Sequence, residues 1–282
     1  MNQFFQSVEF DAVALCASHL ARLQQFYSDV LGFEVTASSP NAARLGPAGQ
    51  SGSLVVIRQG DGAPPRPRAT AGLFHVAFLY PDRPSLAQAL RRVIDRGVPI
   101  GSADHGVSEA IYLADPEGNG IELYADRHPD EWPPRMADGQ VAMYTEPLDV
   151  DALLAFAGDG PAGPPRIGHV HLSVADLGHA ERFYGALLGM SVTQRSYPGA
   201  LFLARDGYHH HVGANVWRSN RRAEPGALGL EYVALRVKSP GDLQSIVTRL
   251  DAAGHPYERL ADVLTTEDLD GIRLNLSYSD NL

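Results

Sequence analysis

The sequence predicts an α+β fold built from four consecutive βαβββ modules. The chain repeats itself: residues 25–33 recur as residues 182–190, and residues 71–77 recur as residues 228–234, both at an offset of 157 residues. Each repeat contains two amphipathic stripes with helical spacing, and short apolar runs separated by Gly, Pro, Asn or Asp follow each stripe. The chain is therefore a tandem duplication in which each half holds two modules.

Each module is expected to begin with an apolar strand and to continue into a helix that a glycine closes. The apolar positions of the four stripes are Leu20, Leu23, Phe26, Tyr27, Val30 and Leu31, then Leu86, Leu90, Val93 and Ile94, then Leu177, Ala180, Phe183, Tyr184 and Leu187, then Leu243, Ile246, Val247 and Leu250. Because the two Phe-Tyr pairs match helical packing positions, they are expected in the core. Short strands, such as residues 53–57 and 200–204, follow the helices.

The repeat boundaries predict two domains and a connection. The first domain covers residues 1–126, with modules at 5–60 and 70–126, and the second covers residues 166–282, with modules at 166–220 and 226–281. Residues 127–165, which are rich in Pro, Gly and Asp and contain Trp132, are expected to link them. A short helix is predicted within this connection at residues 150–156.

Composition excludes several classes of function. The 282-residue chain is 44% hydrophobic, which suits folded domains, and carries a net charge of −10 without a run of Lys or Arg. Neither a nucleic-acid partner nor a polybasic membrane patch is expected. The single cysteine, Cys16, excludes an internal disulfide framework, and residues 1–10 lack the features of a signal peptide. A cytoplasmic location is therefore expected. No apolar run is long enough to cross a bilayer.

Two stretches, residues 105–122 and residues 208–211, concentrate groups suited to acid-base and metal chemistry. Together with His75 and His169, they offer two imidazoles and one carboxylate for a divalent metal, and further His and Tyr side chains remain. Two histidines and one carboxylate form the ligand set of non-haem Fe(II) oxygenases. The pattern therefore favours an enzyme.

The order of these groups resembles the vicinal oxygen chelate superfamily, which includes glyoxalase I, bleomycin resistance proteins and type I extradiol dioxygenases. The matching elements are His105-Gly106, Ile111-Tyr112, the sequence DPEGN at 115–119, and the strand-borne Glu122. The resemblance covers nearly the whole chain and is strongest for two-domain enzymes of the catechol 2,3-dioxygenase kind. It implies that the four modules form two paired, barrel-like, half-open β-sheet domains.

The resemblance also implies a ligand set. The superfamily's ligand positions on the first strands fall on Ala12, His75, His169 and Tyr232, and those on the last strands fall on Glu122 and Asn275. Only modules two and three retain ligands, whereas modules three and four hold the iron in the usual two-domain extradiol pattern. We therefore predict one metal site from His75, Glu122 and His169, and a vacant mirror site around Ala12, Tyr232 and Asn275.

Each candidate has a simpler structural interpretation. His75 and His169 could form hydrogen bonds in the core, and Glu122 could face solvent on an edge strand, although a buried carboxylate without a cation is costly. His171 shares a strand face with His169 and is expected to support a ligand, or to be the ligand itself if the register differs. His211 could be a general base, a fourth ligand or a polar turn residue. His105 and Tyr112, taken singly, are common turn and strand residues.

The function that the resemblance implies is extradiol cleavage of catechol or a substituted catechol by O2, which gives a semialdehyde. Fe(II) is the expected cofactor, with Mn(II) as the alternative. His211 would act as the base, while His105 and Tyr112 would hydrogen-bond the substrate oxygens. The alternatives are a glyoxalase I-like isomerase, which needs a fourth ligand, and a non-catalytic protein that binds an aromatic drug. The superfamily often forms dimers, so a homo-oligomer is also compatible with the resemblance.

Overall fold

The computed structural model describes residues 8–50, 52–158 and 162–278. In the first half of the chain the elements are β1 (Val8–Ala17), α1 (Leu20–Asp29), β2 (Phe33–Ser39), β3 (Ala42–Pro47), β4 (Val55–Gln59), β5 (Ala69–Thr70), β6 (Gly72–Tyr80), α2 (Arg83–Asp95), β7 (Gly101–Asp104), β8 (Ser108–Ala114) and β9 (Gly120–Asp126). A 3₁₀ turn, η2 (Pro129–Glu131), and a short helix, α3 (Val150–Leu154), lie in the connection.

The second half repeats this order. Its elements are β10 (Arg166–Ser173), α4 (Leu177–Ala180), the π-helix η3 (Glu181–Leu187), β11 (Ser191–Gln194), β12 (Ala200–Ala204), β13 (Val212–Asn215), β14 (Ser219–Arg221), β15 (Gly229–Val237), α5 (Pro240–Ala252), β16 (Tyr257–Leu260), β17 (Val263–Glu267) and β18 (Arg273–Tyr278). The α+β fold class and the fourfold βαβββ order are confirmed. The short helix predicted at 150–156 is also present, as α3.

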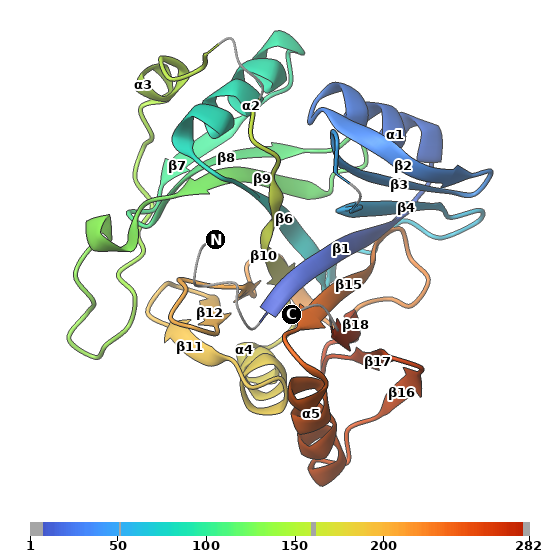
Figure 1. Cartoon of the computed structure of the whole chain (residues 1–282). Coiled ribbons are helices and arrows are strands. Elements are labelled where there is room, and N and C mark those ends of the chain that lie inside the picture. Colours follow the sequence, from blue (N-terminus) through green and yellow to red (C-terminus); the bar gives the residue numbers. More distant parts are fainter. Residues whose placement is uncertain (1–7, 51, 159–161, 279–282) are drawn as a thin grey trace.

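Two eight-stranded sheets organise the described chain, and each combines one module from either half. One sheet runs β16-β17-β18-β15-β1-β4-β3-β2 and joins modules one and four. The other runs β11-β12-β13-β10-β6-β9-β8-β7 and joins modules two and three. Antiparallel pairs join the modules, β1 with β15 and β6 with β10, which lie side by side in Figure 1. Modules two and three therefore share the sheet in which the metal site was predicted.

The predicted domain boundaries follow the two halves of the sequence, and they stay a prediction. Because both sheets take strands from both halves, neither half completes an eight-stranded sheet alone. The outermost residues of the predicted modules, 5–7 and 279–281, lie outside the described residues.

Three of the four predicted amphipathic stripes form α-helices, although Ile94 of the second stripe is 42% exposed, and the third stripe differs. There the α-helix ends at Ala180 and the chain continues as the π-helix η3, in which Phe183, Tyr184 and Leu187 are buried. The backbone N–H of Leu188 donates to the carbonyl of Phe183, five residues earlier, which is the hydrogen-bond spacing of a π-helix. Helical spacing alone could not separate the two windings, because both place these side chains against the core.

The mirror position between modules one and four has an apolar floor instead of a ligand set. Ala12, Ala14 and Val56 are buried there, and Tyr232 packs against them. The side-chain oxygen of Asn275 accepts a hydrogen bond from the Thr265 hydroxyl at 3.0 Å.

None of the helices in the described ranges is long and apolar enough to span a membrane.

Candidate functional site

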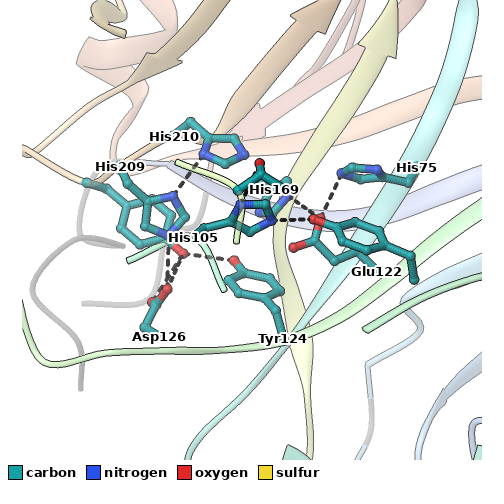
Figure 2. A network of polar contacts seen from close by, with 11 residues as sticks. His75, His105, Glu122, Tyr124, Asp126, His169, His209 and His210 are labelled. Carbon is teal, nitrogen blue, oxygen red and sulfur yellow. Dashed lines mark hydrogen bonds and ion pairs between the residues drawn. The ribbon is translucent and has the colours of Figure 1, made fainter. Parts of the chain in front are cut away.

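Three ligand-type side chains converge in the sheet of modules two and three. His75 Nε2 lies 2.8 Å from Glu122 Oε2, and His169 Nε2 lies 3.1 Å from the same oxygen (Figure 2). All three side chains are buried, with exposures of 5%, 2% and 1% for His75, Glu122 and His169. Within the described residues this is the group whose donor atoms lie close enough together to hold one metal ion. The geometry thus brings together the three predicted ligands.

Strand register explains the convergence. The three residues come from adjacent strands in the order β10, β6 and β9, and Ala77 on the central strand is paired with both His169 and Glu122. Alternation places His75 on the same face as Ala77, because they lie two residues apart. Since alanine ends at Cβ, it leaves room above the central strand for the side chains on either side. A larger residue at position 77 would occupy that space.

The charges of this group suit a divalent cation. Burial lowers the pKa of His169 to about 4, so its imidazole is neutral at pH 7. Burial raises the pKa of Glu122, but interactions with His169 and His75 lower it by more, and the net pKa lies well below the usual range. The site therefore presents the neutral imidazole of His169 beside a buried carboxylate. A buried negative charge of this kind is costly unless a cation compensates it.

His105 and Tyr112 form a hydrogen-bonded pair beside this group. His105 Nε2 lies 2.7 Å from the Tyr112 hydroxyl, and His105 Nδ1 lies 2.7 Å from the carbonyl of Tyr144. Because a carbonyl only accepts, His105 Nδ1 carries a hydrogen and donates it to the Tyr144 carbonyl. Burial, together with the nearby Glu122 carboxylate, raises the pKa of Tyr112 well above its ordinary value, so the phenol stays protonated. Gly106 permits this arrangement, since a Cβ there would lie 2.6 Å from the Tyr144 ring.

His171 faces the same cavity but lies outside the ligand group. Its ring centroid is 5.0 Å from that of His75, which is its register partner across the β6–β10 pair. Gly213 lies opposite it on β13, and a Cβ there would meet the His171 ring at 2.9 Å. Burial lowers the pKa of His171 well below its ordinary value, so this imidazole is also neutral at pH 7.

The structure places His210, and not His211, on the cavity. His210 lines the cavity, and its ring centroid lies 4.1 Å from that of His169. His211 is buried on the other side of the chain, where its Nδ1 accepts a hydrogen bond from the Arg205 backbone and its ring packs on Tyr208. The sequence contains three adjacent histidines, and it does not indicate which of their side chains faces the cavity.

A second buried network lies behind His169. Asp126 accepts hydrogen bonds from His209 at 2.9 Å and from the Tyr208 hydroxyl at 3.2 Å. The hydroxyl groups of Tyr208 and Tyr124 lie 2.8 Å apart, and the Tyr124 ring packs against His169 at 4.8 Å between centroids. Figure 2 shows this network beside the ligand group. Its role was not anticipated from the sequence.

The cavity above the ligands has a volume of about 530 Å³. Besides the groups already described, its walls are Phe74, Val107, Leu113, Ile121, Met143, Thr145, Gln194, Tyr197, Phe202, Trp217 and Arg218, among others. The connection contributes Met143, Tyr144 and Thr145, so it forms a wall of the cavity as well as linking the halves. It is held in place by a backbone β-bridge between Asp104 and Glu146 and by the side-chain amide of Gln194, which donates to the Met143 carbonyl. The size and largely apolar lining fit a small aromatic molecule.

The repeated modules correspond to a known family model. The model of the glyoxalase/bleomycin resistance protein/dioxygenase superfamily matches residues 9–123 and 166–275. The chain belongs to this superfamily. The superfamily model leaves out residues 124–165, which include the cavity wall formed by the connection.

Two curated members of the superfamily are similar in sequence. The chain is 37% identical to a catechol-2,3-dioxygenase of Bacillus subtilis over 278 residues, which cover 95% of this chain and 96% of the relative. It is 33% identical to biphenyl-2,3-diol 1,2-dioxygenase 3 of Rhodococcus globerulus over 114 residues, which cover 40% of this chain and 60% of that protein.

Two solved structures share the fold of this chain. A candidate dioxygenase of Bacillus subtilis superimposes with a TM-score of 0.69 at 11% identity, covering 98% of this chain and 86% of that one. Glyoxalase I of Zea mays superimposes with a TM-score of 0.59 at 15% identity, covering 96% and 92%. At these identities the likeness concerns the fold alone.

Proposed function

We propose that the protein is an Fe(II)-dependent extradiol dioxygenase of the catechol 2,3-dioxygenase type. Catechol or a substituted catechol and O2 would be its substrates, and a ring-opened semialdehyde its product. The observation that carries the proposal is the buried His75–Glu122–His169 group at the floor of a largely apolar cavity. The similarity to a catechol-2,3-dioxygenase over 95% of the chain supports the same reaction.

The donor set fits the proposed metal. Two neutral imidazoles and one carboxylate are the ligands of the facial-triad Fe(II) oxygenases. When bound, Fe(II) would supply two things: a positive charge that favours ionised catechol, and open positions for the diol and O2. Mn(II) accepts the same nitrogen and oxygen donors and is the alternative metal.

The remaining cavity groups would bind the diol and move its protons. His210 replaces His211 in the proposed role of base, because His210 lines the cavity and packs on the ligand His169. The Tyr112 hydroxyl, oriented by His105 at 2.7 Å, would hydrogen-bond a substrate oxygen. Phe74 and Trp217 line the cavity and would contact the aromatic ring.

An isomerase of the glyoxalase I kind would need a fourth ligand. His211 was the sequence candidate for that position, and its ring instead packs on Tyr208 behind the cavity. The ligand group found within the described residues has three members. This count favours the dioxygenase.

The test is to load the protein with Fe(II) under anaerobic conditions, add catechol and then admit air. We expect O2 consumption that matches the appearance of a yellow ring-fission product. Protein that binds iron but yields no such product with catechol or substituted catechols would contradict the proposal and favour the isomerase.

A further inference from the structure

A chain of hydrogen bonds leads from Asp126 through His209 to His210 at the cavity. Asp126 Oδ1 lies 2.9 Å from His209 Nε2, and His209 Nδ1 lies 2.8 Å from His210 Nδ1. Asp126 ends β9, the strand that also carries Glu122, so the chain begins on the scaffold of the ligand group. Both histidines are buried.

The chemistry of each group decides which nitrogen carries each hydrogen. A carboxylate only accepts hydrogen bonds, so His209 donates to Asp126 through Nε2–H. In a neutral imidazole the other nitrogen then has a lone pair, and His209 Nδ1 must accept. His210 therefore donates through Nδ1–H, and its Nε2 is left with a lone pair. Figure 2 shows the second nitrogen of His210 pointing away from His209.

Packing holds both rings in this arrangement. The His209 ring lies against Tyr208 at 4.0 Å and Trp132 at 5.7 Å between centroids. The His210 ring lies against His169 at 4.1 Å and Phe202 at 4.9 Å. Asp126 is itself oriented by the Tyr208 hydroxyl, which donates to it at 3.2 Å. Packing and hydrogen bonds therefore fix the positions of Asp126, His209 and His210 in this series.

We propose that Asp126 and His209 are positioning residues that hold His210 in the Nδ1–H tautomer, with the Nε2 lone pair available to a substrate hydroxyl. The opposite tautomer would offer an N–H to that hydroxyl and could not accept its proton. The tautomer follows from the contacts of a neutral His209 imidazole, whereas its use on a diol rests on the proposed function. The two parts are therefore tested by different measurements.

The tautomer is tested by NMR on the full-length protein labelled with ¹⁵N-histidine, in the metal-free and the diamagnetic Zn(II)-loaded forms. The shifts of the ring nitrogens report which one carries hydrogen, and loss of a signal in His210→Gln identifies His210. We expect the Nδ1–H form in the unmodified protein. An Nε2–H form of His210 in the unmodified protein would by itself overturn the proposal.

Variants then test the cause. We expect Asp126→Asn and His209→Leu to give a mixture of tautomers at His210. His209→Asn should keep the Nδ1–H form, because an asparagine oxygen can accept where Nδ1 did. Tyr208→Phe is the matched control, since it removes a different donor from the same carboxylate, and the Nδ1–H form should persist. A pure Nδ1–H form in both Asp126→Asn and His209→Leu would overturn the assignment.

Kinetics on Fe(II)-loaded protein test the functional part. We expect kcat for catechol to fall about 10- to 100-fold in Asp126→Asn and His209→Leu, with KM within about twofold and iron content unchanged. His209→Asn should recover most of the rate. Unchanged kcat in variants with altered tautomers would overturn the positioning role. Absence of turnover in the unmodified protein would instead contradict the proposed function, and the NMR result would still decide the tautomer.

Discussion

At the scale of single residues, chemistry in this site depends on which of several similar side chains faces the cavity. His209, His210 and His211 are adjacent and all buried, yet they contact Asp126, the cavity and the Arg205 backbone respectively. Burial leaves the imidazoles of His169, His171 and His210 neutral at pH 7, because it lowers their pKa values. Neutral imidazoles can ligate a metal or accept a proton.

The first prediction concerns Glu122. Glu122→Gln keeps the volume of the side chain but removes the charge that holds the cation, so iron retention should fall about 10-fold or more. The measurement is iron content after loading and desalting. Glu109→Gln is the matched control, because Glu109 is also buried but is not one of the three ligand candidates. Its carboxylate forms an ion pair with Arg83 at 2.6 Å. Equal iron content in the two variants would contradict the ligand role of Glu122.

The second prediction separates His210 from His211. His210→Asn should lower kcat about 10²- to 10⁴-fold, because it removes the imidazole on the cavity, while iron stays bound. His211→Asn should change kcat by no more than a few fold, since asparagine can still accept the hydrogen bond from the Arg205 backbone. Steady-state kinetics on both iron-loaded variants provide the measurement. The reverse order of effects would return the role of base to His211.

At the scale of elements, the same hydrogen bond between a turn aspartate and a helix tyrosine recurs in both halves of the chain. The turn before the last strand of an even-numbered module binds the helix of the preceding module: Asp115 accepts from Tyr27, and Asp268 accepts from Tyr184. In the same turns, Glu117 accepts from the backbone N–H groups of residues 18 and 19, and Asp270 accepts from that of residue 175. Tyr27, Phe183 and Tyr184 are therefore core residues, Phe26 packs half-buried against the core, and each tyrosine also forms a hydrogen bond.

The third prediction follows from the burial of Asp268, which raises its pKa to about 6. Because the folded pKa exceeds the unfolded value of about 3.9, the folded state binds this proton more tightly. The contribution of Asp268 to stability therefore falls as pH rises from about 4 through about 6, by up to about 3 kcal/mol. Urea unfolding at pH 4.5 and pH 7.5 should show that Asp268→Asn gains stability relative to the unmodified protein at the higher pH. Parallel pH dependence in the two proteins would contradict this.

At the scale of the whole molecule, the candidate site joins the two halves of the sequence. His75 and Glu122 come from the first half, His169 comes from the second, and the antiparallel pair of β6 and β10 brings them together. A metal bound there would link strands that are distant in the chain. Binding to the folded state alone stabilises it by mass action.

The fourth prediction is that metal raises the melting temperature of the intact protein. At a free metal concentration of about 100 Kd, the expected stabilisation is about 2.7 kcal/mol, which corresponds to several degrees for a chain of this size. Differential scanning calorimetry with Mn(II) and with a chelator provides the measurement. The shift should fall by about half or more in Glu122→Gln and persist in Glu109→Gln. A shift of the same size in both variants would place the metal elsewhere.

The sequence by itself determined the fourfold βαβββ order and the three ligand candidates. The order follows from local periodicity and from a repeat that can be aligned within one chain, as the recurrence of residues 25–33 at 182–190 shows. The ligand candidates follow from the resemblance to the superfamily. The restriction of ligands to modules two and three also follows from that alignment, because Ala12, Tyr232 and Asn275 occupy the other ligand positions.

Only the tertiary structure decided which histidine of the triplet meets the cavity, and that the connection forms one of its walls. A one-residue change of register reverses the direction of a side chain, and no local pattern sets the register of the 208–211 turn. The Asp126–His209–His210 chain joins β9 of module two to the turn before β13 of module three. Contacts between such distant segments depend on how the sheets assemble, which the periodicity of a single segment does not encode.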